Sequence, residues 1–351
     1  MTTPDAFDFT SPPTADRLIL RREVVRQGQT DADIRRALGD KLIERVWWGS
    51  YVPTAADDSV DEFVRRTNQY REMVLAAVRT GGPRRYLSHQ SAACLLEIPL
   101  LAPDLSTVHF TAELSGRSSK TLRIHQSSST TRDLVSIDGI EVTGIARTVC
   151  DVARQGTLRQ AVCALDSGLY QARRRSIEVA LAPAVAAMDR KHGIATLRQA
   201  LPLASDLSES IDESLSKVTI YESGPIPMPD AQVEIVLADG SVVRSDFGWR
   251  DDDGVLRVVG EFDGRVKYHR QSAASGGRLA EDVIYEEKLR EDAIRECGII
   301  VARWTWSDLK TPGVLIRRLS VALQRPGSSD ASALPLVSAV LCRASLAHGR
   351  E

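Results

Sequence analysis

The sequence lacks the features of a membrane or secreted protein. No apolar run approaches the roughly 20 residues that a membrane-spanning helix needs. The N-terminus, MTTPDAFDFTSPPT, lacks the basic and then apolar order of a signal peptide. The five cysteines are scattered without CxxC spacing, which argues against both a disulfide framework and a cysteine zinc site. We therefore expect a cytoplasmic protein with free, buried thiols and no membrane partner.

The chain also has little net charge, −2 in total, so any surface for nucleic acid must be a local basic patch. Its hydrophobic share of 43% and charged share of 26% are ordinary for a soluble globular protein. With 351 residues it is longer than one typical domain. We expect an α+β multidomain protein with a disordered segment 1–14 and domains at 15–60, 67–204 and 205–310, followed by a C-terminal helix and tail at 311–351.

The first of these domains has the element order of a winged helix-turn-helix. Residues 18–28 predict a short amphipathic helix. Thr30 and Asp33 predict the capped start of a second helix that ends at Gly39. Residues 42–53 then predict a β-hairpin, the wing.

Basic residues concentrate in this domain, with eight Lys or Arg against five Asp or Glu between residues 17 and 50. Four of them, Arg35, Arg36, Lys41 and Arg45, lie on or after the second helix and are expected to reach the phosphates and base edges of DNA. The alternative is a small packing module with a solvated basic face.

Residues 67–204 predict a central mixed α/β scaffold in which short strands separate helices. His89, His109 and His125 fit no recognised metal-binding spacing, so we expect hydrogen-bonded structural histidines. Asp151 and Asp166 are expected to pair with nearby arginines.

Residues 205–310 predict a helix, three antiparallel strands, a second helix and a last strand. The second and third strands form a hairpin whose turn is the acidic cluster 251–254. If Arg250 faces Val255 in this turn, Asp246 pairs with Val259.

In that register Asp246, Glu261 and Asp263 fall on one face of the hairpin. Clustered carboxylates need a cation, and oxygen ligands suit a hard divalent ion, so we expect Asp246, Glu261 and Asp263 to bind Mg²⁺ or Mn²⁺. The alternative is a solvated turn whose neighbouring acids only face water.

The order of Glu213, Asp246 and the run EFDG at 261–264, followed by Lys267 and His269, resembles the PD-(D/E)XK restriction-endonuclease fold in its form close to very-short-patch-repair endonucleases. Five segments, SHQSAA, GIARTVCD, ESLSKVTIYESG, GEFDGRVKYH and EEKLREDAIRECGIIVARWTW, resemble actinobacterial proteins related to AbiEi-type antitoxins. Together the resemblances cover most of the chain from about residue 17 to 310.

The endonuclease resemblance implies a restriction-endonuclease-like C-terminal domain and Mg²⁺-dependent hydrolysis of DNA. Asp246 and Glu261 would bind the metal, and Glu213 would complete the site. Asp263 stands where the commonest motif has lysine, and it would add a ligand or act as a base.

That departure requires a cation from elsewhere, for which Lys267, Arg265 and Lys288 are candidates, while His269 would transfer a proton.

Two functions follow from these resemblances. The first is a DNA-binding, metal-dependent endonuclease. The alternative is a non-enzymatic AbiEi-like antitoxin and transcriptional autorepressor, whose partner is a nucleotidyltransferase toxin and whose nuclease fold is only a scaffold.

Overall fold

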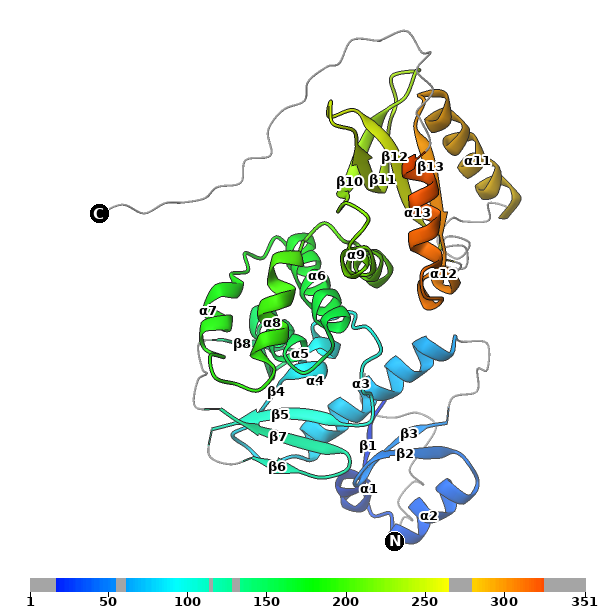
Figure 1. Cartoon of the computed structure of the whole chain (residues 1–351). Coiled ribbons are helices and arrows are strands. Elements are labelled where there is room, and N and C mark those ends of the chain that lie inside the picture. The colour runs from blue at the N-terminus through cyan, green and yellow to red at the C-terminus, as the bar shows by residue number, and fades with distance from the viewer. Residues whose placement is uncertain (1–16, 55–60, 114–115, 128–132, 265–279, 325–351) are drawn as a thin grey trace.

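The structure, a computed structural model, is a mixed α/β protein with several sheets and multiple domains (Figure 1). It describes residues 17–54, 61–113, 116–127, 133–264 and 280–324. The segment 1–14 that was expected to be disordered and the tail after residue 324 lie outside the described residues.

The N-terminal elements form a three-stranded sheet of order β1-β3-β2 with two helices. The helix expected at residues 18–28 begins only at Arg21, because Ile19 and Leu20 pair with Tyr51 and Ser50 as a strand. Alternation along this strand explains the difference: Ile19 enters the core under the two helices, whereas Leu20 packs toward the long helix at residues 62–80. In chain order the elements are β1 (Ile19–Leu20), α1 (Arg21–Arg26), α2 (Asp31–Gly39), β2 (Ile43–Trp47) and β3 (Ser50–Pro53).

The capped start of α2 is confirmed. Thr30 accepts a hydrogen bond from the backbone of Asp33, whose side chain accepts one from the backbone of Thr30. The next helix, α3 (Glu62–Thr80), begins after Asp61, whose side chain accepts hydrogen bonds from two backbone N–H groups of its first turn.

The central part of the chain is a six-stranded mixed sheet of order β6-β7-β5-β4-β9-β8 covered by helices (Figure 1). Two of its pairs, β5 with β7 and β4 with β9, are parallel. The elements are β4 (Tyr86–Leu87), α4 (His89–Leu95), β5 (Val108–Ala112), β6 (Arg117–Ser118), β7 (Leu122–Gln126), β8 (Leu134–Ile137), β9 (Ile140–Thr143), α5 (Ile145–Ala153), α6 (Leu158–Arg174), α7 (Leu181–Ala186), α8 (Ile194–Ala200) and the 3₁₀ helix η2 (Leu201–Leu203).

The C-terminal part has the expected element order, with a four-stranded sheet of order β10-β11-β12-β13. The first three strands are antiparallel, and β12 runs parallel to β13. The elements are α9 (Ile211–Ser223), β10 (Asp230–Val236), β11 (Val242–Arg250), β12 (Leu256–Phe262), α11 (Ala280–Glu296), β13 (Ile300–Trp304), α12 (Trp306–Lys310) and α13 (Val314–Gln324).

One hydrophobic core continues from the central sheet to the C-terminal sheet through the contact of α6 with α9. A buried ion pair crosses this contact, with Lys217 Nζ 2.6 Å from Asp166 Oδ2. The expectation of an arginine partner for Asp166 is therefore wrong. Asp151 does pair with two arginines, Arg147 and Arg154.

In the part of the chain that the structure describes, no helix is both long and apolar enough to cross a membrane.

Candidate functional site

The acidic hairpin forms, but its register is two residues from the expected one. Gly248, not Asp246, lies opposite Val259, and the ladder shifts between Trp249 and Arg250. The turn accounts for one of these residues, because Arg250 pairs with Leu256 instead of Val255 around a loop in which the Asp251 carboxylate accepts hydrogen bonds from the backbone of residues 253 and 255. The irregularity between Trp249 and Arg250 accounts for the other.

Asp246 lies at an irregular point of the sheet. The β10–β11 ladder skips the pair of Gln232 and Asp246, and Gln232 has a φ of +53°, in the left-handed region that side chains disfavour. The β11–β12 ladder ends next to Asp246, at Phe247 opposite Gly260. The Asp246 carboxylate accepts a hydrogen bond from the backbone N–H of Phe262 at 2.9 Å.

Glu261 binds arginines. Its Oε1 accepts hydrogen bonds from Ser245 at 3.1 Å and from Arg290 of α11 at 2.9 Å. Its Oε2 lies 2.9 Å from Arg303, the residue beside it on the parallel strand β13. Burial acts to lower the pKa of Arg303, but the carboxylates of Glu261, Glu287 and Glu291 outweigh it and raise that pKa. The positive charges of Arg290 and Arg303 thus balance the negative charge of the Glu261 carboxylate.

Glu213 is buried in the first turn of α9, where its carboxylate accepts hydrogen bonds from three groups. These are the backbone N–H of Glu209, the Ser210 hydroxyl and the Gln232 amide, at 3.0, 2.8 and 2.8 Å. Asp263 follows β12 and is half-buried, with its backbone N–H bonded to Trp304.

The described residues therefore do not show the expected convergence of Asp246, Glu261 and Asp263. Among these residues no three acids have ligand atoms that all lie within 4.8 Å of one another. Strand alternation would place the three carboxylates on one face only in a regular ladder, and the ladder is interrupted at Asp246 on both sides. Lys267, His269 and Arg265 lie outside the described residues, and the binding of Mg²⁺ or Mn²⁺ stays a prediction.

The basic residues of the N-terminal elements are exposed as expected. Arg36 contacts Asp33 in the same helix at 3.2 Å, with 71% of its side chain exposed, so the pair is weak. Arg35, Lys41 and Arg45 have no carboxylate within 4.0 Å in the described ranges. Their charges are therefore available to an anionic partner.

The turn of the β2–β3 hairpin presents an aromatic side chain beside a cation. Trp48 is 74% exposed, and the Arg45 guanidinium carbon lies 5.1 Å from the centre of its ring. Gly49, with a φ of +66°, makes the tight turn that projects Trp48 into solvent.

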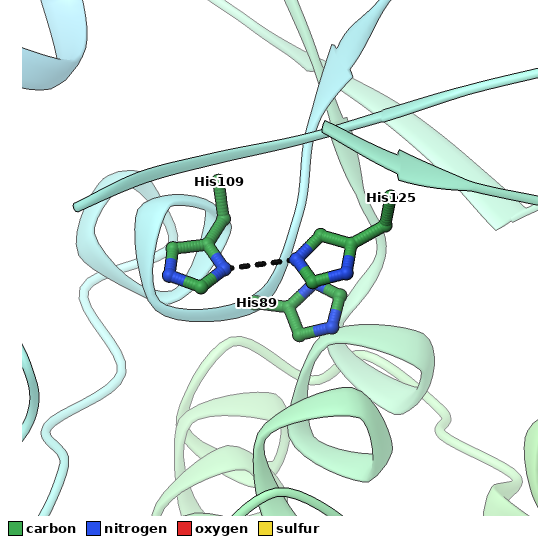
Figure 2. Close-up of side chains that lie close together, drawn as sticks. All are labelled: His89, His109 and His125. Atoms are coloured by element: carbon green, nitrogen blue, oxygen red, sulfur yellow. Dashed lines mark hydrogen bonds between the residues drawn. The ribbon is translucent and has the colours of Figure 1, made fainter. Parts of the chain in front are cut away.

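A second site, which the sequence reasoning set aside, gathers three histidines in the central domain (Figure 2). His109 on β5 lies two residues before Thr111, which pairs with His125 on the parallel strand β7, so both histidines share one face. His109 Nδ1 and His125 Nε2 are joined by a hydrogen bond of 3.0 Å. His89, at the start of α4, stacks on His125 with ring centres 3.8 Å apart.

All three imidazoles are held in the neutral form. Burial and nearby Arg123 together lower the pKa of His109 to about 4. Burial and His109 likewise lower the pKa of His125 to about 4. Burial also lowers the pKa of His89 well below its ordinary value, although Asp151 acts to raise it.

Three charged residues of helix α5 and its C-cap lie beside these rings. They are Arg147, Asp151 and Arg154, which are four and three residues apart. The Asp151 carboxylate, fully buried, accepts hydrogen bonds from Arg147 at 2.6 Å and Arg154 at 3.0 Å. Burial acts to raise the pKa of Asp151, but His89 and the two arginines lower it to about 2. Arg154 also donates to His89 Nε2 at 3.3 Å.

The spacing of Arg147, Asp151 and Arg154 along the sequence predicts that the three side chains lie on one face of a helix. The meeting of the histidines was not readable, because it depends on the β5–β7 pairing and on where α4 begins.

No family model matches the chain. Two uncharacterized proteins of Mycobacterium tuberculosis, MT2308 of strain CDC 1551 and Rv2248 of strain H37Rv, are each 28% identical to it over 193 residues, 55% of this chain. The chain covers 65% of the length of these relatives, slightly less than two thirds. The crystal structure of the M. tuberculosis protein RV2827C aligns with a TM-score of 0.31 and 15% identity, over 55% of this chain and 78% of that one.

Proposed function

We propose that the chain binds double-stranded DNA through its N-terminal elements and acts in the cytoplasm as a transcriptional repressor of the antitoxin kind. The observation that carries this proposal is a set of exposed cations, Arg35 on α2, Lys41 in the turn after it and Arg45 on β2, with no carboxylate within 4.0 Å in the described ranges.

The arrangement of these elements supports DNA as the partner. Two short helices separated by a turn are followed by a hairpin, and β1 pairs with its second strand, β3, which lies in the middle of the sheet. In a winged helix-turn-helix the second helix enters the major groove, and flanking elements contact the backbone. Here Arg35 and Arg36 would face the groove, and Arg45 with Trp48 would contact the strand beside it.

Repression is favoured over cleavage by the state of Glu261. Its two oxygens are bonded to Arg290 and Arg303, and a metal would have to displace both guanidinium groups. The partner we propose besides DNA is a nucleotidyltransferase toxin, which co-purification from the native host would test.

The test of DNA binding is fluorescence anisotropy with a labelled duplex from upstream of the chain's own gene, compared with a scrambled duplex. The double variant Arg35→Ala/Arg36→Ala should bind more weakly and lose about 2 from the slope of log K against log salt, about 0.9 for each lost phosphate contact. The control Arg173→Ala/Arg198→Ala removes the same charge from exposed positions of α6 and α8. Equal salt slopes in the two double variants would refute this role of α2.

A metal-dependent endonuclease is the second candidate, favoured by the C-terminal topology and by the strained backbone beside its acids. The order helix, three antiparallel strands, helix and parallel strand agrees with a restriction-endonuclease-like domain. The left-handed residue Gln232 is bonded to Glu213 and lies beside Asp246, and such strain often marks functional sites.

Incubating the purified protein with plasmid and Mg²⁺ or Mn²⁺, beside Asp246→Asn and Glu261→Gln, separates the two candidates. Cleavage that both variants lose would establish the nuclease. Intact plasmid together with specific duplex binding would support the repressor.

A further inference from the structure

A cavity of about 300 Å³ opens beside the three histidines, and its lining includes three cations and one carboxylate. Its walls include His125, Ser127, Arg147, Arg154 and Lys191. They come from β7 and the residue after it, from α5 with its C-cap, and from the segment between α7 and α8. These segments meet only in the folded chain.

The cavity carries more positive than negative charge. Three cations, Arg147, Arg154 and Lys191, surround one carboxylate, Asp151, which already accepts hydrogen bonds from both arginines. Lys191 has no carboxylate within 4.0 Å in the described part of the chain. Burial lowers the pKa of Lys191, and so do Arg147 and Arg154, as expected for a cation near like charges.

The Ser127 hydroxyl lies close to two of these cations, Arg147 and Lys191. It accepts a hydrogen bond from Arg147 at 3.3 Å and lies 3.5 Å from Lys191 Nζ, both long distances for charge-assisted bonds. Two cations thus converge on one neutral oxygen. An anion at this place would replace two weak contacts with strong ones.

A metal ion fits the same side chains poorly. The lone pair of His89 Nε2 accepts from Arg154, and His89 Nδ1 bonds to Ser88. His109 and His125 use one nitrogen each on one another. The planes of the His89 and His125 rings differ by 16° and the ring centres are 3.8 Å apart, so their lone pairs lie in two separate, nearly parallel planes and one ion cannot lie in both.

We propose that this cavity binds the phosphate group of a small phosphorylated molecule. Arg147, Arg154 and Lys191 supply the positive charge, and Ser127 supplies a hydroxyl donor. A volume of about 300 Å³ is at the lower end of ligand pockets, which suits a phosphate with a small organic group.

The test is isothermal titration calorimetry of the full chain with inorganic phosphate and with adenosine monophosphate. Lys191→Ala should weaken binding roughly tenfold to a hundredfold, the effect of losing one hydrogen bond to a charged group. Lys191→Arg should keep most of the affinity. Lys120→Ala, which removes the same charge from an exposed position in the same domain, should leave binding unchanged.

Tighter binding of the nucleotide than of phosphate would support a site that also holds the organic group. Equal binding of the two would support a site for the phosphate alone. Failure of both probes to bind at millimolar concentration would overturn the proposal. So would Zn²⁺ binding that His125→Ala abolishes and Lys191→Ala leaves intact, because the cavity would then be a metal site.

Discussion

Lowering the pH from 7 to 5 should destabilise the central domain through its buried histidines. His109 is 3% exposed, and its pKa is about 4 in the folded chain against an ordinary 6.5. The unfolded chain therefore binds a proton at a pH where folded His109 does not, so stability falls as the pH drops below 6.5.

The expected loss is about 2 kcal/mol for His109 alone between pH 7 and pH 5, from the two pKa values through proton linkage. His125 and His89 act in the same direction, with His125 adding less because it is more exposed. Asp151 does not titrate in this window, since its pKa is about 2.

Backbone hydrogen exchange of residues 108–112, corrected for the intrinsic effect of pH, is a suitable measurement. Tryptophan fluorescence is a less direct measurement, because the five tryptophans lie at positions 47, 48, 249, 304 and 306, outside residues 67–204. In His109→Gln the loss of protection between pH 7 and pH 5 should be smaller by about 2 kcal/mol.

The control is Ser91→Ala, which removes the hydroxyl that accepts a hydrogen bond from the His109 backbone at 2.8 Å. It should lower protection at both pH values and keep the wild-type dependence on pH. An equal loss in wild type and His109→Gln would refute the conclusion that burial keeps His109 neutral.

Three further predictions concern packing and capping. Lys217→Met should cost about 3–5 kcal/mol in urea unfolding by leaving Asp166 buried without its partner, and Asp166→Leu added to it should recover most of the loss; no recovery would contradict this. Gly260→Ala should cost about 1–3 kcal/mol, because a Cβ atom there would lie 2.5 Å from the Trp304 ring. An unchanged urea midpoint would show that the ring moves freely. Thr30→Ala should lower protection of the α2 amides by about 1 kcal/mol through loss of the capping box, and unaltered exchange there would exclude that role.

The sequence by itself determined most elements and their local chemistry. Thr30 and Asp33 predicted the cap of α2, and residues 42–53 predicted the hairpin, because these depend on neighbours a few residues away. The helix-and-strand order after residue 205 was readable from periodicity for the same reason.

Only the tertiary structure decided which side chains meet. Glu261 was assigned to a metal, but its partner Arg303 lies beside it through the β12–β13 pairing. His89, His109 and His125 fit no sequence motif, yet strand pairing and the start of α4 bring them together. Contacts of this kind depend on strand register and helix docking, and the spacing of residues along the chain carries little of that information.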